Sequence, residues 1–377
     1  MNFVRKIRNF IKMHKRYFII FFVLFGISMV LNIFSRTVPG FADGYITYIY
    51  PFAVNSLGRI NSVFPFSVGE ILIVIGILIL ALAFLILPFG LLVSKGRLWG
   101  RTKKFYGFFA MLLNVIFLVQ TVNCFILYQG TTLESKMVSQ DGYEVTELIA
   151  LREHIVAKLN ELGIQMKRNP QGDLIYDEEE IKTGCIKAMQ QLGEEYPQLQ
   201  GYYPNPKKLY FSKFASQQYL SGIFFPFSME ANYNGVMYLS NYPATICHEL
   251  SHLKGIILED EANFYAYLAC IQSEDLFFQY SGYLSVFYYV ENDLLSVISQ
   301  EDYQTLTKVA SYVYQDDIFL KEETWAEIEE KAVLDTETVD EISDTLTEKS
   351  LNLNGVEDGM NSYSRVVNLL LAYYHER

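Results

Sequence analysis

Three long apolar stretches dominate the first third of the chain. They cover residues 17–34, 68–93 and 105–128. Each is long enough to cross a bilayer as a helix, which takes about 20 predominantly apolar residues. The first stretch has a long apolar core and no small-residue cleavage site after it, so it predicts an uncleaved anchor rather than a signal peptide. The pattern therefore predicts three transmembrane helices within residues 1–128.

The rest of the chain, residues 129–377, shows the shorter periods of a folded soluble domain. Helical spacing of apolar positions predicts helices over residues 146–162, 178–192, 259–271, 281–298 and 361–374. Short runs of β-forming residues predict strands over residues 208–212, 222–227 and 235–240, with a hairpin turn at 234–235. The aromatic run 276–290 is too short for a fourth span and is expected in the core. We therefore expect a mainly helical α+β domain with a small β-sheet.

Charge divides the chain at the same place as hydropathy. Residues 1–128 hold only two acids, Asp43 and Glu70, whereas the rest of the chain gives the protein its net charge of -12. Basic residues precede the first span and fill the loop between the second and third: Arg5, Lys6, Arg8, Lys12, Lys15, Arg16, Lys95, Arg97, Arg101, Lys103 and Lys104.

Lys and Arg concentrate in the cytoplasmic loops of membrane proteins. The charge pattern therefore predicts a multi-pass protein of the cell membrane with a cytoplasmic N-terminus and residues 129–377 outside the cytoplasm. The loop 36–67 has only Arg36 and Arg59 as cations and is rich in Tyr and Phe. We expect it to lie along the outer membrane interface rather than to form a free domain.

One short motif carries the candidate chemistry. His248, Glu249 and His252 form an HExxH sequence, and the chain has only 5 histidines. Residues four apart on a helix lie one above the other, so both imidazoles can bind one zinc ion. Glu249 then lies within reach of a zinc-bound water and can take its proton. Pro243 before the motif and Gly255 after it suit the first turn and the end of a helix.

A hydrolytic zinc site needs a third protein ligand and an open position. Seven residues along one helix is about 10 Å, so Glu259 can join His252 only if the chain turns at Gly255 and a second helix packs back. Glu259 falls on a stripe of small residues, which lets two helices approach closely, whereas Glu261 lies among bulkier side chains. The pattern favours Glu259 and leaves Glu261 as the alternative. Asn263, one turn after Glu259, is the candidate to orient a ligand.

Residues just before the motif are the candidates for substrate binding. An edge strand beside the metal helix of a zinc peptidase often binds the substrate as an added strand. Residues 223–234 are the candidate segment for this role. Their polar residues Glu230, Asn232 and Asn234 are expected either in the cleft or in turns.

Taken together, the motifs resemble an uncharacterised bacterial family of multi-pass membrane proteins, a domain of unknown function assigned to zinc metallopeptidases. The matching segments are residues 64–67, 222–232, 243–252, 259–264, 280–283 and 361–365, which span nearly the whole chain. The run Glu-Asp-Glu-Ala-Asn at 259–263 also resembles gluzincins, whose third zinc ligand is a glutamate on the helix after HExxH. This resemblance implies a zincin-like outer domain with Glu259 as ligand. Gluzincins often stabilise the oxyanion with a Tyr or His, and Tyr363 or Arg365 is the candidate here.

We therefore expect a membrane-anchored zinc metallopeptidase, with residues 1–128 as anchor and residues 129–377 as the extracytoplasmic domain. One Zn²⁺ per chain would be bound by His248, His252 and Glu259, and Glu249 would act as general base on a peptide or protein substrate outside the cytoplasm. The sequence shows no nucleic-acid-binding patch.

Two alternatives remain. The first is a membrane sensor or structural protein whose zinc only stabilises the outer domain. The second is an intramembrane protease, which would bury residues 242–254 in lipid. The polar setting of the motif, more than a hundred residues after the last span, argues against the second.

Overall fold

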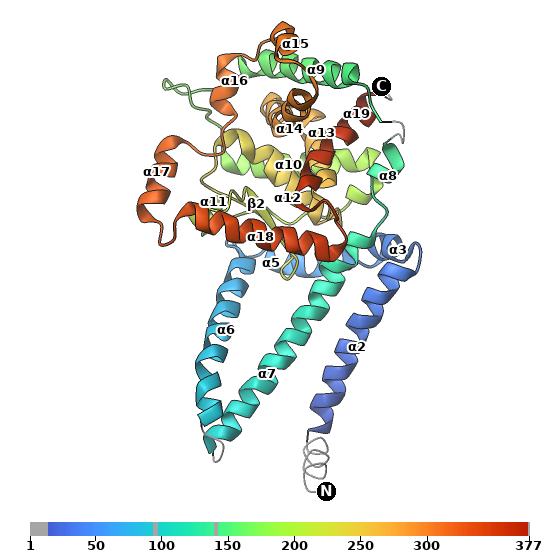
Figure 1. The fold of residues 1–377 in the computed structure, drawn as a ribbon, viewed down its shortest axis with the longest axis vertical. Coiled ribbons are helices and arrows are strands. Elements are labelled where there is room, and N and C mark those ends of the chain that lie inside the picture. The colour runs from blue at the N-terminus through green and yellow to red at the C-terminus, as the bar shows by residue number, and fades with distance from the viewer. Residues whose placement is uncertain (1–13, 93–96, 139–141, 376–377) are drawn as a thin grey trace.

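The computed structural model describes residues 14–92, 97–138 and 142–375, with the side chains of 89–98 excepted. Three long helices project from one side of a helical body (Figure 1). Part of the topology prediction concerns positions outside the described residues, namely Arg5, Lys6, Arg8, Lys12, Val93 and Lys95, together with the side chain of Arg97.

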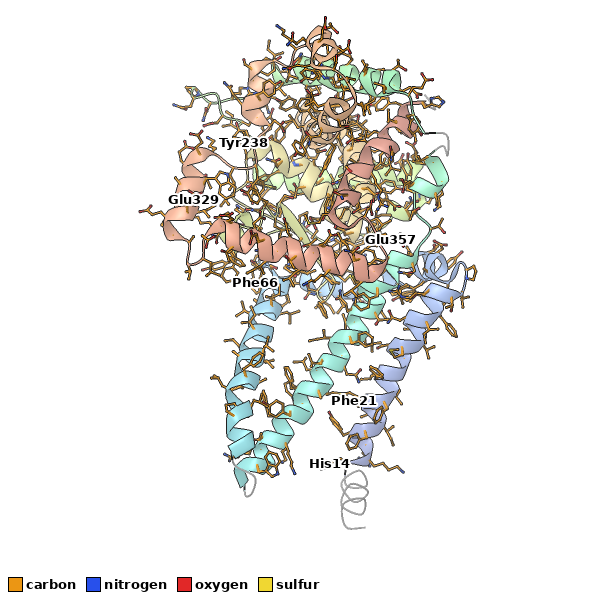
Figure 2. All side chains as sticks on the ribbon, in the orientation of Figure 1. His14, Phe21, Phe66, Tyr238, Glu329 and Glu357 are labelled. Atoms are coloured by element: carbon orange, nitrogen blue, oxygen red, sulfur yellow. The ribbon has the colours of Figure 1, made fainter. Side chains whose placement is uncertain are left out.

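The three projecting helices are α2 (Lys15–Thr37), α6 (Val68–Leu92) and α7 (Arg97–Gln120). All three are long and apolar enough to cross a membrane, and the third apolar segment continues to Met137. It does so through η2 (Thr121–Phe125), η3 (Leu127–Gln129) and α8 (Glu134–Met137). Only 11% of the apolar window of α2 and 6% of that of α6 is buried. Apolar side chains such as Phe22 and Phe25 are therefore exposed, as lipid-facing side chains are. Figure 2 shows the side chains that surround these helices.

Two buried or half-buried asparagine side chains among these helices donate hydrogen bonds to a neighbouring helix. Asn114 Nδ2 donates to the carbonyl oxygen of Phe21 at 2.7 Å, and Asn32 Nδ2 donates to Thr121 Oγ1 at 2.8 Å. Both bonds join α2 to the third apolar segment. Such pairing is what an apolar solvent requires, because an unpaired polar group in hydrocarbon is costly.

The loop between α2 and α6 packs against the body. It forms α3 (Phe41–Tyr48), α4 (Pro51–Ala53), η1 (Val54–Gly58) and α5 (Arg59–Asn61). Tyr45, Tyr50 and Val54 are buried in the same apolar cluster as the helices of the body. The Tyr50 hydroxyl donates to the carbonyl oxygen of His252 at 3.2 Å. The loop is therefore part of the support of the HExxH helix, and experiments on the site should use the full chain.

The small sheet has three strands in the order β1-β3-β2: β1 (Lys207–Lys208), β2 (Gly222–Phe225) and β3 (Glu230–Tyr233). β1 and β3 are parallel, and β2 and β3 are antiparallel. The predicted strand at 222–227 is present in its first four residues. Of the predicted strand at 208–212 only Lys208 belongs to a strand, β1, and α11 (Ser212–Ser216) begins at the last residue of that range.

The predicted strand at 235–240 and hairpin turn at 234–235 are wrong. The last strand is β3, the turn lies between Phe225 and Glu230, and residues 239–241 form a 3-10 helix, η5 (Leu239–Asn241). All four residues of β3 are buried, two of them polar. A strand with both faces buried shows no alternation of apolar and polar residues, so the periodic signal was missing.

The helices of the body are α9 (Val145–Gly163), α10 (Glu178–Glu195), α12 (Tyr242–His252), α13 (Glu259–Ile271), α14 (Leu276–Val297), α15 (Gln300–Thr305), α16 (Ser311–Asp316), α17 (Glu322–Lys331), α18 (Thr336–Asn354) and α19 (Val366–His375), with η4 (Pro197–Leu199) and η6 (Gly359–Arg365). Of these, α9, α10, α13, α14 and α19 match the five predicted helices, except that α14 starts five residues earlier and the predicted helix at 361–374 begins as η6. The helices α15 to α18 had no counterpart among the predicted ranges.

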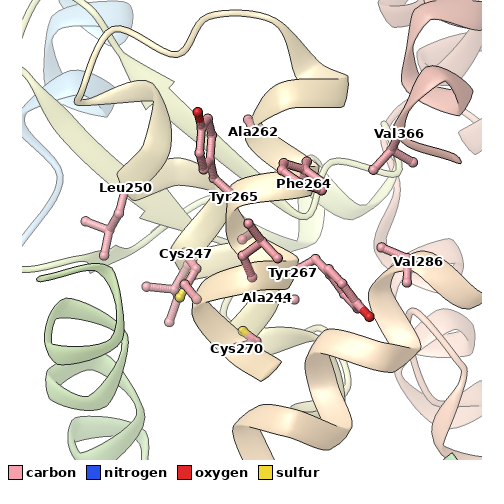
Figure 3. Close-up of a cluster of buried hydrophobic side chains, with 14 of the residues drawn as sticks. Ala244, Cys247, Leu250, Ala262, Phe264, Tyr265, Tyr267, Cys270, Val286 and Val366 are labelled. Carbon is pink, nitrogen blue, oxygen red and sulfur yellow. The ribbon is translucent and has the colours of Figure 1, made fainter. Parts of the chain in front are cut away.

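The helices α12 and α13 pack closely because small side chains line their contact. Figure 3 shows Ala244 and Cys247 of α12 near Cys270 of α13, with Ala262 farther along α13, and all four are buried. Larger residues such as Tyr267 fill the space toward α14 and α19. This close approach allows side chains at the ends of the two helices to meet.

Candidate metal centre

A turn at Gly255 places the two helices of the site against each other. Pro243 occupies the first turn of α12, where its missing N–H costs nothing. After His252 the chain turns through Gly255, which adopts a left-handed φ of 85° that favours glycine. The new helix α13 starts at Glu259. The predicted reversal of the chain at Gly255 is present.

The reversal brings three candidate ligands together. His248 Nε2 lies 3.1 Å from Glu259 Oε2, and His252 Nε2 lies 3.8 Å from the same oxygen. The three ligand atoms all lie within 4.8 Å of one another. Atoms bound tetrahedrally to zinc at about 2.0–2.1 Å are roughly 3.3 Å apart, so these separations fit one shared ion.

Hydrogen bonds on the far side of each imidazole orient the rings. His248 Nδ1 lies 2.8 Å from Asn263 Oδ1, and His252 Nδ1 lies 2.7 Å from the carbonyl oxygen of Ile256. A carbonyl oxygen only accepts hydrogen bonds, so Nδ1 of His252 carries a proton. Asn263 Oδ1 is also an acceptor, so Nδ1 of His248 carries a proton as well. In the neutral form of each ring the lone pair is therefore on Nε2, which faces Glu259, and this is the tautomer that a metal ligand needs.

Asn263→Ala is expected to weaken zinc binding by about 10–100-fold, the usual cost of removing a group that orients a histidine ligand. The loss follows from the freed His248 ring, which no longer favours the tautomer with Nε2 unprotonated. Zinc affinity of the full chain in detergent, measured by competition with a chelating dye, checks this expectation. Asn263→Asp keeps an acceptor oxygen and should retain most of the affinity, while an unaltered affinity in Asn263→Ala would show that the contact is incidental.

Glu249 is buried beside the three ligand atoms and is held by the sheet. It is 4% exposed, and its Oε2 has no hydrogen-bond partner among the described residues. Burial raises the pKa of its carboxyl to about 8. A Cβ on Gly222 of β2 would lie 2.5 Å from Glu249 Oε1, so only glycine leaves space for this carboxylate. Sequence analysis did not identify Gly222 as part of the site, because its contribution is the space that a missing side chain leaves.

The ionisable side chains of the cluster shift one another's pKa values. Burial alone would lower the pKa of His248, but the Glu259 carboxylate outweighs it and raises that pKa to about 9. Burial lowers the pKa of His252 to about 4. Burial favours a raised pKa for Glu259, yet the two histidines dominate and lower it. A buried carboxylate thus stays ionised among imidazoles, the arrangement that a divalent metal ion stabilises best.

The alternative third ligand points elsewhere. The Glu261 carboxylate accepts a hydrogen bond from the backbone N–H of Leu133, and burial raises its pKa to about 7. Among the described residues, only Glu259 joins the two histidines in a cluster of potential metal ligands. The helical stripe that favoured Glu259 over Glu261 therefore agrees with the observed packing.

Tyr363 and Arg365, the two candidates for the oxyanion, have different surroundings. The Tyr363 side chain hydrogen-bonds Glu259, and burial raises the pKa of its hydroxyl far above the usual range. Arg365 instead pairs with Asp260 at 3.4 Å and with Asp358 at 3.5 Å. Tyr363 thus stays protonated beside the ligand cluster, whereas the cation of Arg365 is engaged by these two carboxylates.

The polar residues of β3 do not reach the site as a group. Glu230 pairs with Lys207 and accepts backbone N–H groups of Val68 and Gly69 at 3.2 and 2.7 Å, so it fastens the sheet to the start of α6. Asn234 Nδ2 donates to Ser216 Oγ at 2.8 Å. Asn232 is fully buried within the sheet. The prediction that Glu230 or Asn232 faces the cleft is not met, because each lies inside the body.

A cavity of about 1240 Å³ opens beside the ligand cluster. Its walls include residues of β2, α12, α13, α14, α18, η6 and the upper end of the third apolar segment. His248, Glu249, His252, Glu259 and Tyr363 all line it. An extended peptide segment therefore has room to reach the three ligand atoms and Glu249.

Comparison with known proteins adds a family but no activity. A family model described as a protein of unknown function, DUF3810, matches residues 45–371. No curated protein and no solved structure matches the chain.

Proposed function

The chain belongs to DUF3810, a family of proteins of unknown function, and we propose that it is a membrane-anchored zinc metallopeptidase that hydrolyses peptide bonds outside the cytoplasm. The observation that carries the proposal is the convergence of His248, His252 and Glu259 beside the buried Glu249. A purely structural zinc site has four protein ligands and no base. Here three ligand atoms face a cavity, and a carboxylate lies next to them.

Each residue of the cluster has one task in this proposal. His248, His252 and Glu259 would hold the zinc ion. Zinc in such a site supplies a Lewis acid and lowers the pKa of its water to about 7. Glu249 takes a proton from the attacking water and later gives it to the leaving amine. Its pKa of about 8 suits both directions of transfer near neutral pH.

Tyr363 is the proposed donor to the oxygen of the scissile carbonyl. Its hydroxyl is buried beside Glu259, and its raised pKa keeps the proton in place. A protonated hydroxyl next to the reacting carbonyl stabilises the negative charge that develops on that oxygen. Arg365 is less suited to this role because it pairs with Asp260 and Asp358.

The strand β2 is the proposed binding edge for the peptide. The sheet order leaves one side of β2 unpaired. Asn234 N–H donates to Ser221, so by alternation Ile223 bonds across to β3, and Gly222 and Phe224 direct their backbone groups to the open side. Gly222, Ile223 and Phe224 line the cavity. A substrate added along this edge would place one peptide bond beside Glu249.

The proposed topology puts the site on the outer side of the membrane. α2, α6 and the third apolar segment would each cross the bilayer, with the N-terminus in the cytoplasm as the basic residues predict. The helix α12, which carries HExxH, has 11 residues and is outside these three segments. Hydrolysis would therefore take place in water rather than within the bilayer.

The full chain, purified in detergent, is expected to contain about one zinc per chain and to lose peptidase activity when a chelator removes it. Adding zinc back should restore the rate. Metal content by mass spectrometry and cleavage of a quenched fluorescent peptide library provide the two measurements. Full activity in protein without bound metal would exclude the zinc mechanism.

A further inference from the structure

The binding edge β2 runs from the ligand cluster to the membrane-spanning helices. Its first residue, Gly222, packs against Glu249. At its other end, a Cβ on Gly69, in the first turn of α6, would collide with the Phe225 ring. The carbonyl oxygen of Pro226 accepts a bond from Asn123 Nδ2 at 2.7 Å. Gly222 and Phe225 are three residues apart, which is about 10 Å of extended chain.

The floor of the cavity is built from the third apolar segment. Gln120, Cys124 and Tyr128 all line the cavity that holds the ligand cluster. They belong to α7, η2 and η3 in turn, and all three face the same cavity. The descent from Tyr128 to Gln120 covers about 12 Å along the helix. The cavity is thus continuous from the three ligand atoms to the part of the chain that would lie at the outer surface of the bilayer.

The opposite wall of the cavity is the helix α18, which crosses above the tops of α6 and α7 (Figure 1). Its cavity-lining residues are all polar: Asp340, Ser343, Asp344, Thr347 and Ser350. Ile342, Leu346 and Leu353 form an exposed apolar stripe on another side of the helix.

The C-terminal end of α18 is held at the level of the spans. Gln129 Nε2 donates to the carbonyl oxygen of Asn354 at 3.1 Å, and Arg36 donates to that of Leu353 at 3.5 Å. Arg36 belongs to the last turn of α2, and Gln129 follows α7. The polar wall of the cleft therefore lies just above the predicted outer surface of the bilayer.

We propose that the substrate is a membrane-tethered polypeptide, cut in the segment that leaves the outer surface of the bilayer. The inference rests on the proposed peptidase function. A chain emerging beside Phe225 covers the 10 Å to Glu249 in about three residues at 3.3 Å each. The scissile bond should therefore lie roughly three to six residues from the anchor. An anchor could be a single apolar helix or a fatty acyl chain, since both present the same extended segment.

The test uses the full chain reconstituted in phosphatidylcholine vesicles with some phosphatidylglycerol. The substrates are quenched fluorescent peptides attached to an acyl chain or to an apolar helix. Spacers of about 4, 8 and 24 residues, all built from one repeated sequence, separate the peptide from the anchor. We expect cleavage at one constant position near the anchor. The same peptide without an anchor should be cleaved at least about tenfold more slowly than the anchored one. The two anchor types separate a lipid-attached substrate from a membrane-spanning one.

Tethering alone concentrates any peptide at the surface, so the position of the cut is the deciding measurement. A peptidase that gains only from concentration would cut the repeat sequence anywhere along the spacer. Cuts spread evenly over the spacer of about 24 residues, or equal rates for free and tethered peptide, would overturn the inference while leaving the peptidase function intact.

A binding measurement separates the two proposals if no cleavage occurs. A photoreactive residue replaces Ile223 on β2 in the Glu249→Gln background. A control chain carries it at the exposed Tyr314 of α16, which does not line the cavity. Cross-links from position 223 to residues close to the anchor would support presentation at the membrane even if hydrolysis fails. Equal cross-linking from both positions, or none from position 223, would contradict it.

Discussion

Glu249→Gln is expected to lower the peptidase rate by about 10²–10⁴-fold, while the zinc content should stay near one per chain. The glutamine side chain has the same shape as the buried glutamate and fits against Gly222, so packing should persist. Glutamine cannot take a proton from water, and the general base is lost. Cleavage rates and metal content, measured on the same preparation, provide the check.

Glu261→Gln is the matched control for this variant. Glu261 lies on the neighbouring helix α13, is buried like Glu249, and accepts a hydrogen bond from Leu133 N–H that a glutamine oxygen can also accept. Its rate should remain within about threefold of the wild type. Undiminished hydrolysis by Glu249→Gln would rule out Glu249 as the base. A wild-type protein that binds zinc yet cleaves no peptide, free or tethered, would favour the non-catalytic sensor.

His252→Ala is expected to weaken zinc binding by about 10²–10³-fold and to abolish hydrolysis. Structural zinc sites bind with about 10–16 kcal/mol in total, so one ligand accounts for roughly 3–4 kcal/mol. The wild-type chain should also melt at a higher temperature when zinc is added, because a ligand that binds only the folded state stabilises it by about 4 kcal/mol at a thousand times its Kd. The variant should lose this response.

Two further variants keep this result interpretable. His252 is buried, so its removal could disturb the fold on its own. Glu259→Gln keeps the volume of the side chain but removes the charge that faces both histidines, and should show the same loss of zinc response. His375→Ala, at an exposed histidine that bonds Glu147, should behave as wild type. Tight zinc binding in both His252→Ala and Glu259→Gln would place the metal elsewhere.

The two measurements together distinguish an enzyme from a zinc-stabilised structural domain. Both classes require His248, His252 and Glu259, and in both the melting temperature would respond to zinc. Only an enzyme requires Glu249, because a structural site has no proton to transfer. A chain whose zinc response survives Glu249→Gln while its hydrolysis disappears is therefore a peptidase.

Several features of the fold followed from local patterns in the sequence. The spacing of His248 and His252 predicts one helical face, and α12 has that form. Gly255 predicts the reversal that leads to α13, and its φ of 85° agrees. Hydropathy alone located the three helices that could span a membrane. These features depend on neighbours within one or two turns of the chain, so a single sequence contains enough information for them.

Only the tertiary structure decided what the polar residues of the sheet do and where the cleft leads. Glu230 was a substrate candidate by composition, but Lys207 and the backbone of Val68 and Gly69 engage it. Gly222 showed no chemical signal, yet its missing side chain makes room for Glu249. A buried polar or glycine position is determined by partners far away in the chain, which hydrophobic periodicity does not encode. The path from the ligand cluster to the spans likewise exists only once β2, α7 and α18 have packed together.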